Sequence, residues 1–265
     1  MSLPNITRGE TRLAYVDRGQ GAPLLCLHGF PLDHSMWDMQ TEFLALQQRV
    51  IVPDLRGFGE SSVCPGTVTM EQMADDCVAI LDELQITAPV TVMGLSMGGY
   101  VAWPLLRKYS ERIGRVILCD TRAVGDTPQG IETRLKMAAH VLEHGTSFVA
   151  EAMIPKLFAP DTILNDPAVV ELTRQLILRA DPQAIAAAQR GLAERPDVTS
   201  WLPGFQQPAL VVCGEHDAIS PPDEMRQIAE ALPNARFVLV PRAGHMSPLE
   251  NPGVFNTAVR EFLAG

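Results

Sequence analysis

The pentapeptide G-L-S-M-G at residues 94–98 constrains this chain most, because it places a serine on a sharp turn between two regular elements. Residues 89–93, with three β-branched or aliphatic side chains in a row, are typical of a buried strand, and residues 99–103 open a helix. Glycines are needed at both ends of the turn because a Cβ there would collide with the neighbouring strand and helix. The pattern predicts a nucleophile elbow in which Ser96 has a strained backbone and a projecting hydroxyl.

A nucleophilic serine needs a general base, and that base needs an acid that orients it. Asp217 comes just after the apolar run 209–213, and His245 comes just after the apolar run 237–240. Catalytic groups of open parallel sheets gather at the carboxyl ends of strands, so these side chains are expected at one edge. We therefore predict Ser96 as nucleophile, His245 as general base and Asp217 as the orienting acid.

The order of strand and helix patterns predicts an α/β fold with one interruption. Alternating strands and helices up to residue 121 predict a mostly parallel sheet covered by helices on both faces. Between residues 122 and 203 only helix-like segments occur, at roughly 129–144, 146–157, 167–180 and 183–194. We predict a core formed by 1–121 and 204–265, and a helical cap formed by 122–203 that lies over the strand edge.

Two further motifs carry a resemblance to a known family. H-G-F-P at residues 28–31 follows a strand pattern, and so does D-L-R-G-F-G-E-S at residues 54–61. With the elbow, these motifs make the chain resemble the α/β-hydrolase fold superfamily over nearly its whole length. Within that superfamily it resembles the small esterase, enol-lactonase and cofactor-free perhydrolase subgroup. The resemblance implies an eight-stranded, mostly parallel sheet with the helical cap inserted between strands 6 and 7.

The resemblance also implies the remaining parts of the site. The backbone N–H groups of Phe30 and Met97 would form the oxyanion hole. An apolar substrate pocket is expected around these donors, and no metal or organic cofactor is implied. The expected pocket residues are Leu32, Met153, Leu157, Trp201 and Met246.

Some assignments have competitors within the sequence. Asp120 also follows a strand, and some members of the family place their acid there; Asp217 is favoured because it lies in the commoner G-x-x-D pattern. His28 is expected to hold the oxyanion loop rather than to react. Asp54 and Arg56 are expected to tie their loop together through an ion pair.

The chemistry predicted for this set is acyl transfer from a carboxylic ester of small or medium apolar acyl groups, through an acyl-enzyme. The same triad also serves enol-lactonases, perhydrolases and carbon–carbon bond hydrolases, so these remain alternatives. Outside enzymes, the fold can serve as a ligand receptor, although an intact triad disfavours that interpretation.

Net charge and cysteine content limit the kinds of partner and the compartment that we expect for this protein. The formal net charge of −10 disfavours nucleic acid and anionic membranes, and no apolar run approaches the length of a membrane span. Five cysteines without paired spacing are typical of a reducing cytoplasm, where the protein is expected to act. The expected partner is a small-molecule ester or lactone, and the sequence leaves the oligomeric state open.

Overall fold

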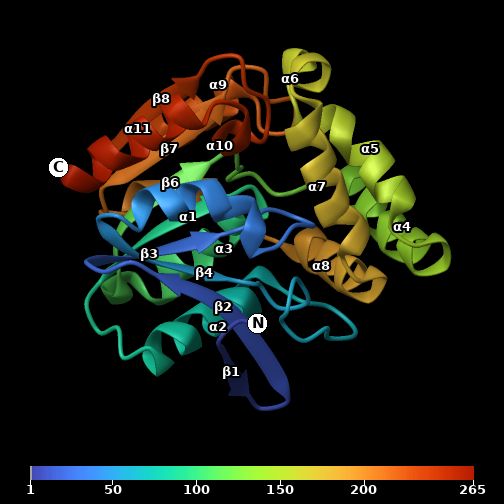
Figure 1. Ribbon diagram of the computed structural model, residues 1–265, viewed down its shortest axis with the longest axis horizontal. Helices are drawn as coiled ribbons and strands as arrows, with labels where there is room; N and C mark the ends of the chain where they lie inside the picture. The colour runs from blue at the N-terminus through green and yellow to red at the C-terminus, as the bar shows by residue number, and fades with distance from the viewer. Residues whose placement is uncertain (1) are drawn as a thin grey trace.

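Short runs rich in valine, leucine and isoleucine form one eight-stranded sheet in the order β1-β2-β4-β3-β5-β6-β7-β8 (Figure 1). The structure is a computed structural model that describes residues 2–265. Strands β3 to β8 are parallel to one another, while β1 pairs antiparallel with β2 and β2 pairs antiparallel with β4 at one edge, which confirms the expected mostly parallel α/β sheet. The strands are β1 (Asn5–Arg8), β2 (Thr11–Arg18), β3 (Ala22–Leu27), β4 (Gln48–Pro53), β5 (Val90–Leu95), β6 (Ile113–Cys119), β7 (Ala209–Gly214) and β8 (Ala235–Val240).

Helices cover both faces of the sheet because each presents an apolar stripe to it. The second of them begins at a capping box formed by Thr69 and Gln72, which fixes its first turn. The helices of the core are α1 (Asp38–Leu44), α2 (Met70–Glu83), α3 (Met97–Lys108), α9 (Pro222–Ala231), α10 (Ser247–Glu250) and α11 (Pro252–Ala264), with short 3₁₀ turns at His34–Trp37, Ser110–Arg112 and Thr199–Gly204.

Five consecutive helices lie between β6 and β7, where the insertion was expected, and we call them the inserted helices. In Figure 1 they stand together at one side of the sheet, from green to orange. Four match the predicted segments, and the fifth, α6, is a short helix that the sequence pattern did not reveal. The inserted helices are α4 (Pro128–His144), α5 (Ser147–Leu157), α6 (Pro160–Asn165), α7 (Pro167–Arg179) and α8 (Pro182–Glu194).

The register of the central strands brings their carboxyl ends level with one another. Leu27 at the end of β3 pairs with Gly94 in β5, and Leu95 pairs with Cys119 at the end of β6. Cys119 in turn pairs with Val212 in β7. The loops that follow these four strands therefore start side by side, which is the sheet edge where the sequence predicts the site.

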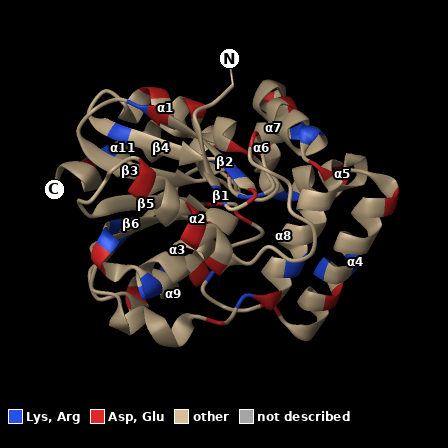
Figure 2. Ribbon diagram, turned by 90° about the horizontal axis from the view of Figure 1, so that it is seen from below, with Lys and Arg blue, Asp and Glu red and all other residues tan. Residues whose placement is uncertain are grey.

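Acidic and basic residues are interspersed along core and inserted helices alike in the view of Figure 2. Among residues 2–265, no helix combines the length and the apolar composition that crossing a membrane would require.

Candidate active site

Ser96 occupies the turn between β5 and α3 with φ 53° and ψ −112°, a conformation that L-residues rarely adopt. Its N–H donates to the Cys119 carbonyl at 2.9 Å, and its own carbonyl accepts from Thr121 Oγ1 at 2.8 Å. Gly98 lies so close to the Leu27 carbonyl that a Cβ at this position would overlap it. Packing and hydrogen bonds from β3 and β6 thus hold the strained turn in place.

His245 and Asp217 form a buried hydrogen-bonded pair. His245 lies in the loop between β8 and α10, and its Nδ1 donates to Asp217 Oδ2 at 2.8 Å. The other oxygen, Oδ1, accepts from the N–H groups of Ile219 at 2.7 Å and Ser220 at 3.0 Å. The bonds to Oδ1 fix the carboxylate so that Oδ2 faces the imidazole. Because Nδ1 is bound to Oδ2, Nε2 is the ring nitrogen that can face a reacting group.

Asp120, the competing acid, has different partners. Its Oδ1 accepts from Gly214 N at 2.8 Å, and its Oδ2 accepts from the Ser247 hydroxyl. Burial, followed by the negative charge of Asp217, raises the pKa of Asp120 well above its ordinary value. Asp120 therefore supports the backbone next to the site, and Asp217 is the aspartate that contacts His245.

The predicted nucleophile and base are not hydrogen-bonded to each other: no such bond joins Ser96 to His245 within residues 2–265. Ser96 does lie directly against the loop after β3. A Cβ built on Gly29 would sit 3.6 Å from the Ser96 Cβ. The segment with the first predicted oxyanion donor is therefore packed on the elbow.

Both predicted oxyanion donors are free of protein acceptors in the described part of the chain. Met97 is the first residue of α3, where an N–H has no intrahelical partner, and the N–H of Phe30 makes no hydrogen bond to the protein. The loop before Phe30 is fixed by His28, whose Nδ1 donates to the Gly29 carbonyl at 2.9 Å and whose Nε2 accepts from Leu55 N at 3.0 Å. Burial lowers the pKa of His28, so a neutral imidazole suits both bonds and the supporting role expected for it.

Four of the five predicted pocket residues lie on segments next to this edge. Leu32 is buried in the loop after β3, and Met246 is buried beside His245. The N–H of Met246 donates to the carbonyl of Leu157 at 3.0 Å, which joins the His245 loop to the end of α5. Met153 is half-buried one turn earlier on α5.

Trp201 has a different position. Its ring packs under the guanidinium of Arg107, 3.9 Å from the ring centroid. With Tyr100 and Trp103 it borders a small cavity of about 10 Å³ that none of the other predicted pocket residues lines.

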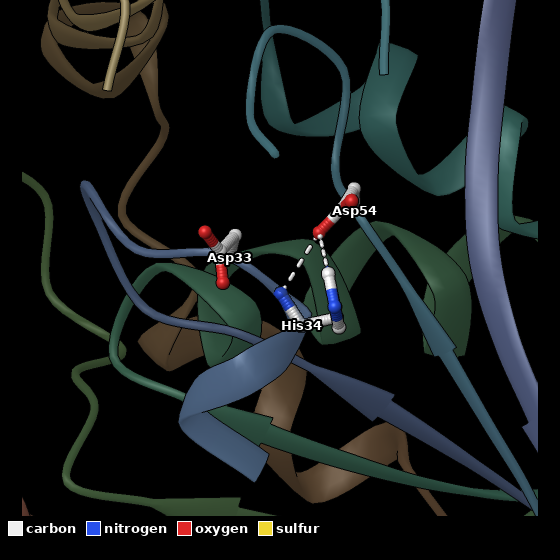
Figure 3. Close-up of side chains that lie close together, drawn as sticks. All are labelled: Asp33, His34 and Asp54. Carbon is white, nitrogen blue, oxygen red and sulfur yellow. Dashed lines mark hydrogen bonds and ion pairs between the residues drawn. The ribbon is translucent and has the colours of Figure 1, made fainter. Parts of the chain in front are cut away.

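The ion pair expected between Asp54 and Arg56 is wrong. Arg56 instead forms a bidentate pair with Asp76 on α2, at 2.6 and 2.7 Å. Asp54 accepts from both the backbone N–H (2.8 Å) and the ring Nδ1 (2.7 Å) of His34, as Figure 3 shows, and from Glu60 N at 2.8 Å. Asp54 and Arg56 thus bind residues of two different segments and not each other.

Next to His34, Asp33 connects the core to the inserted helices. Arg179 at the end of α7 donates to Asp33 Oδ2 at 2.8 and 3.1 Å, and Ser35 donates to Oδ1. The ligand atoms of Asp33, His34 and Asp54 are close enough to bind a metal ion, but protein donors already occupy these carboxylates. The same loop borders a cleft of about 640 Å³, together with residues 57–60, Leu32 and Arg179.

Comparison with known proteins identifies the family. The model of the "Alpha/beta hydrolase family" matches residues 24–258, and the chain belongs to that family. A solved thermophilic esterase from Thermogutta terrifontis is 48% identical, with a TM-score of 0.95 and coverage of 100% of this chain and 97% of the other. The solved enol-lactonase of Burkholderia xenovorans LB400 is 30% identical, with a TM-score of 0.92 and coverage of 99% and 100%. The 3-oxoadipate enol-lactonase 2 of Acinetobacter baylyi is 29% identical over 97% of this chain and 95% of its own length.

Proposed function

We propose that this protein is a serine carboxylic-ester hydrolase that acts on small to medium apolar acyl groups through an acyl-enzyme. The observation that carries the proposal is the buried His245–Asp217 pair, with Asp217 oriented by two backbone N–H groups, at the edge that holds the strained Ser96. The similarity to an esterase over the whole chain supports the same conclusion.

In the proposed reaction the Ser96 Oγ attacks the ester carbonyl while His245 Nε2 takes its proton, and Asp217 stabilises the resulting imidazolium. The N–H groups of Phe30 and Met97 bind the oxyanion, and each such donor is typically worth about 3 kcal/mol. His245 then protonates the leaving alcohol, and water hydrolyses the acyl-enzyme by the same steps. The Ser96–His245 hydrogen bond forms on this proposal when substrate binds, as catalytic bonds often tighten only in the complex.

We further propose that residues 122–203 act as the cap of this site. Leu32, Leu157 and Met246 would provide apolar walls, which suits acyl chains better than charged groups. Substrate would enter through the cleft of about 640 Å³, since that cleft borders the oxyanion loop and the end of α7. The cytoplasmic location stays a prediction from cysteine content.

Ser96→Ala tests the proposal directly. The variant should lose hydrolysis of p-nitrophenyl acetate and butyrate and labelling by a fluorophosphonate, while circular dichroism and the melting temperature stay close to the wild type. Hydrolysis that persists in Ser96→Ala at the wild-type rate would eliminate the serine mechanism.

Enol-lactone hydrolysis is the second candidate, and the similarity to a solved enol-lactonase over the full chain favours it. A panel of lactones, dienoate ketones and simple esters, compared by kcat/KM, separates lactonase and carbon–carbon hydrolase from esterase. Adding peroxide and acetate would reveal perhydrolase activity. Fluorophosphonate labelling without turnover of any substrate would indicate a ligand receptor.

A further inference from the structure

Glu250 holds the loop of His245 from both sides. It is the last residue of α10, five positions after His245, and its half-buried side chain turns back towards that loop. A single oxygen, Oε1, accepts from Gly244 N at 2.7 Å and from Met246 N at 3.2 Å. These two residues flank His245 directly, so one carboxylate oxygen fixes the backbone before and after the imidazole.

The other oxygen of Glu250 contacts the inserted helices. Oε2 accepts from Ala159 N at 2.8 Å and from Thr162 Oγ1 at 2.7 Å, both at the start of α6. Gly244 packs against the same segment, because a Cβ on it would lie only 2.6 Å from Ala159 N. One carboxylate therefore bridges the His245 loop and the inserted helices, which are about 90 residues apart in sequence.

All four donors to Glu250 are neutral groups, so these contacts are hydrogen bonds and not an ion pair. Burial raises the pKa of Glu250, and the hydrogen bonds, with that from Thr162 the largest, offset part of this rise. If Glu250 served only to anchor α6, Oε2 alone would suffice. The placement of Oε1 between the two N–H groups that flank His245 calls for a second role.

We infer that Glu250 is a positioning residue for the reaction, which fixes the His245 backbone and couples it to the inserted helices. The inference rests on the proposed role of His245 as general base. Asp217 holds the imidazole at Nδ1, whereas the backbone around His245 is held by Glu250 and by the Leu157 carbonyl, which shares the Met246 N–H with Glu250. Glu250 is the side chain that bonds the backbone on both sides of His245, and a misplacement of about 1 Å in such a group can cost on the order of a hundredfold in rate.

Glu250→Met, which keeps the length of the side chain but accepts none of the four bonds, is the main test. Activity on p-nitrophenyl butyrate is expressed per active site titrated with a fluorophosphonate. We expect kcat to fall roughly 10- to 100-fold with KM changed less than about twofold. The Nδ1 proton resonance of His245 in ¹H NMR should shift as well. Thr162→Val is the matched control, since it removes one donor on the α6 side only, and it should leave kcat and this resonance near wild type.

Glu250→Gln should restore part of the rate. Its amide oxygen can still accept from Gly244 and Met246, while its NH₂ faces Ala159, so we expect kcat about 2- to 10-fold below wild type. A kcat per titrated site within twofold of wild type in Glu250→Met, with a lower melting temperature alone, would overturn the inference. If the methionine variant does not fold, Glu250→Gln decides: kcat and the His245 Nδ1 resonance both equal to wild type would overturn the coupling of this loop to the inserted helices, since the NH₂ group faces Ala159 N. Activity that survives Ser96→Ala would instead refute the proposed function, so the two failures are distinct.

Discussion

Asp217→Asn tests which aspartate orients the base, and the structure determines how the new amide must lie. Asp217 Oδ1 receives two backbone donors, Ile219 N at 2.7 Å and Ser220 N at 3.0 Å. An NH₂ group at that position would face two N–H groups and leave all three unsatisfied. The asparagine oxygen must therefore take the place of Oδ1, which puts the NH₂ group opposite His245 Nδ1.

This orientation selects the wrong tautomer of the base. Since the NH₂ group donates, Nδ1 must accept, and the imidazole proton moves to Nε2. A protonated Nε2 cannot take the proton of Ser96. In serine proteases the equivalent change costs about 10⁴ in kcat, or roughly 5.5 kcal/mol of transition-state stabilisation, and we expect a loss of the same order here with KM little changed.

Asp120→Asn is the matched control. Its oxygen would accept from Gly214 N, as Oδ1 does at 2.8 Å, and its NH₂ group would donate to the Ser247 hydroxyl, which can also accept. The Gly214 bond is kept and the Ser247 hydroxyl loses only the acceptor for its own O–H, away from His245, so kcat should remain within about tenfold of wild type.

Both variants are assayed with p-nitrophenyl butyrate, with kcat normalised to the folded fraction from circular dichroism. The reasoning fails if Asp120→Asn shows the large loss and Asp217→Asn does not. It also fails if both lose less than about tenfold, because an asparagine facing Nδ1 could not then be setting the tautomer.

Two further predictions concern stability. Gly98→Ala forces a Cβ into the Leu27 carbonyl and should lower the free energy of unfolding by about 3 kcal/mol. Gly253→Ala in the first turn of α11 meets only the Asn251 side-chain oxygen, at 4.0 Å, and should raise the free energy of unfolding by up to about 1 kcal/mol; urea titrations measure both. Burial alone would raise the pKa of Asp126, but the hydrogen bond from Arg195 lowers it below its ordinary value. The pairing therefore stabilises the fold at pH values above the ordinary carboxyl pKa, and this stabilisation is lost as the pH falls through the lowered pKa. Arg195→Met should cost about 2–3 kcal/mol at pH 7 and progressively less below about pH 4, and an equal cost at pH 3 and pH 7 would contradict this.

The fold, and the sheet edge at which the proposed triad lies, could be predicted because their signals are local. Each of Ser96, Asp217 and His245 follows an apolar strand within a few residues, and parallel strands end at one edge of a sheet. The glycines of the elbow are required by close backbone contacts, of Gly98 with Leu27 in β3 and of Gly94 with Gly98 and Gly99 in α3. Local sequence therefore contains both the identity of these residues and most of their position.

Pairings between distant segments could not be predicted in this way. The ion pair expected between Asp54 and Arg56 would have tied one loop together, but each side chain pairs with a residue from another segment. Asp76, the true partner of Arg56, lies twenty residues further along on α2, and His34, the partner of Asp54, lies twenty residues earlier. The choice depends on how the loop packs between β2 and α2, which no local pattern encodes.

The inserted helices show why substrate preference is harder to predict than chemistry. They contact the His245 loop largely through backbone atoms, namely the Leu157 carbonyl and the Ala159 N–H, and a backbone atom leaves no residue type to recognise in a sequence. Trp201 shows the opposite difficulty, since a large apolar side chain within the expected cap suggests a pocket wall, while in the structure its ring packs against Arg107. Glu250 combines both difficulties: its residue type is visible four positions after Met246, but its role depends on α6, a helix of six residues without a strong pattern. The positions of the proposed reacting groups are thus set by strand ends, while the volume around them depends on where a few backbone atoms of the inserted helices lie.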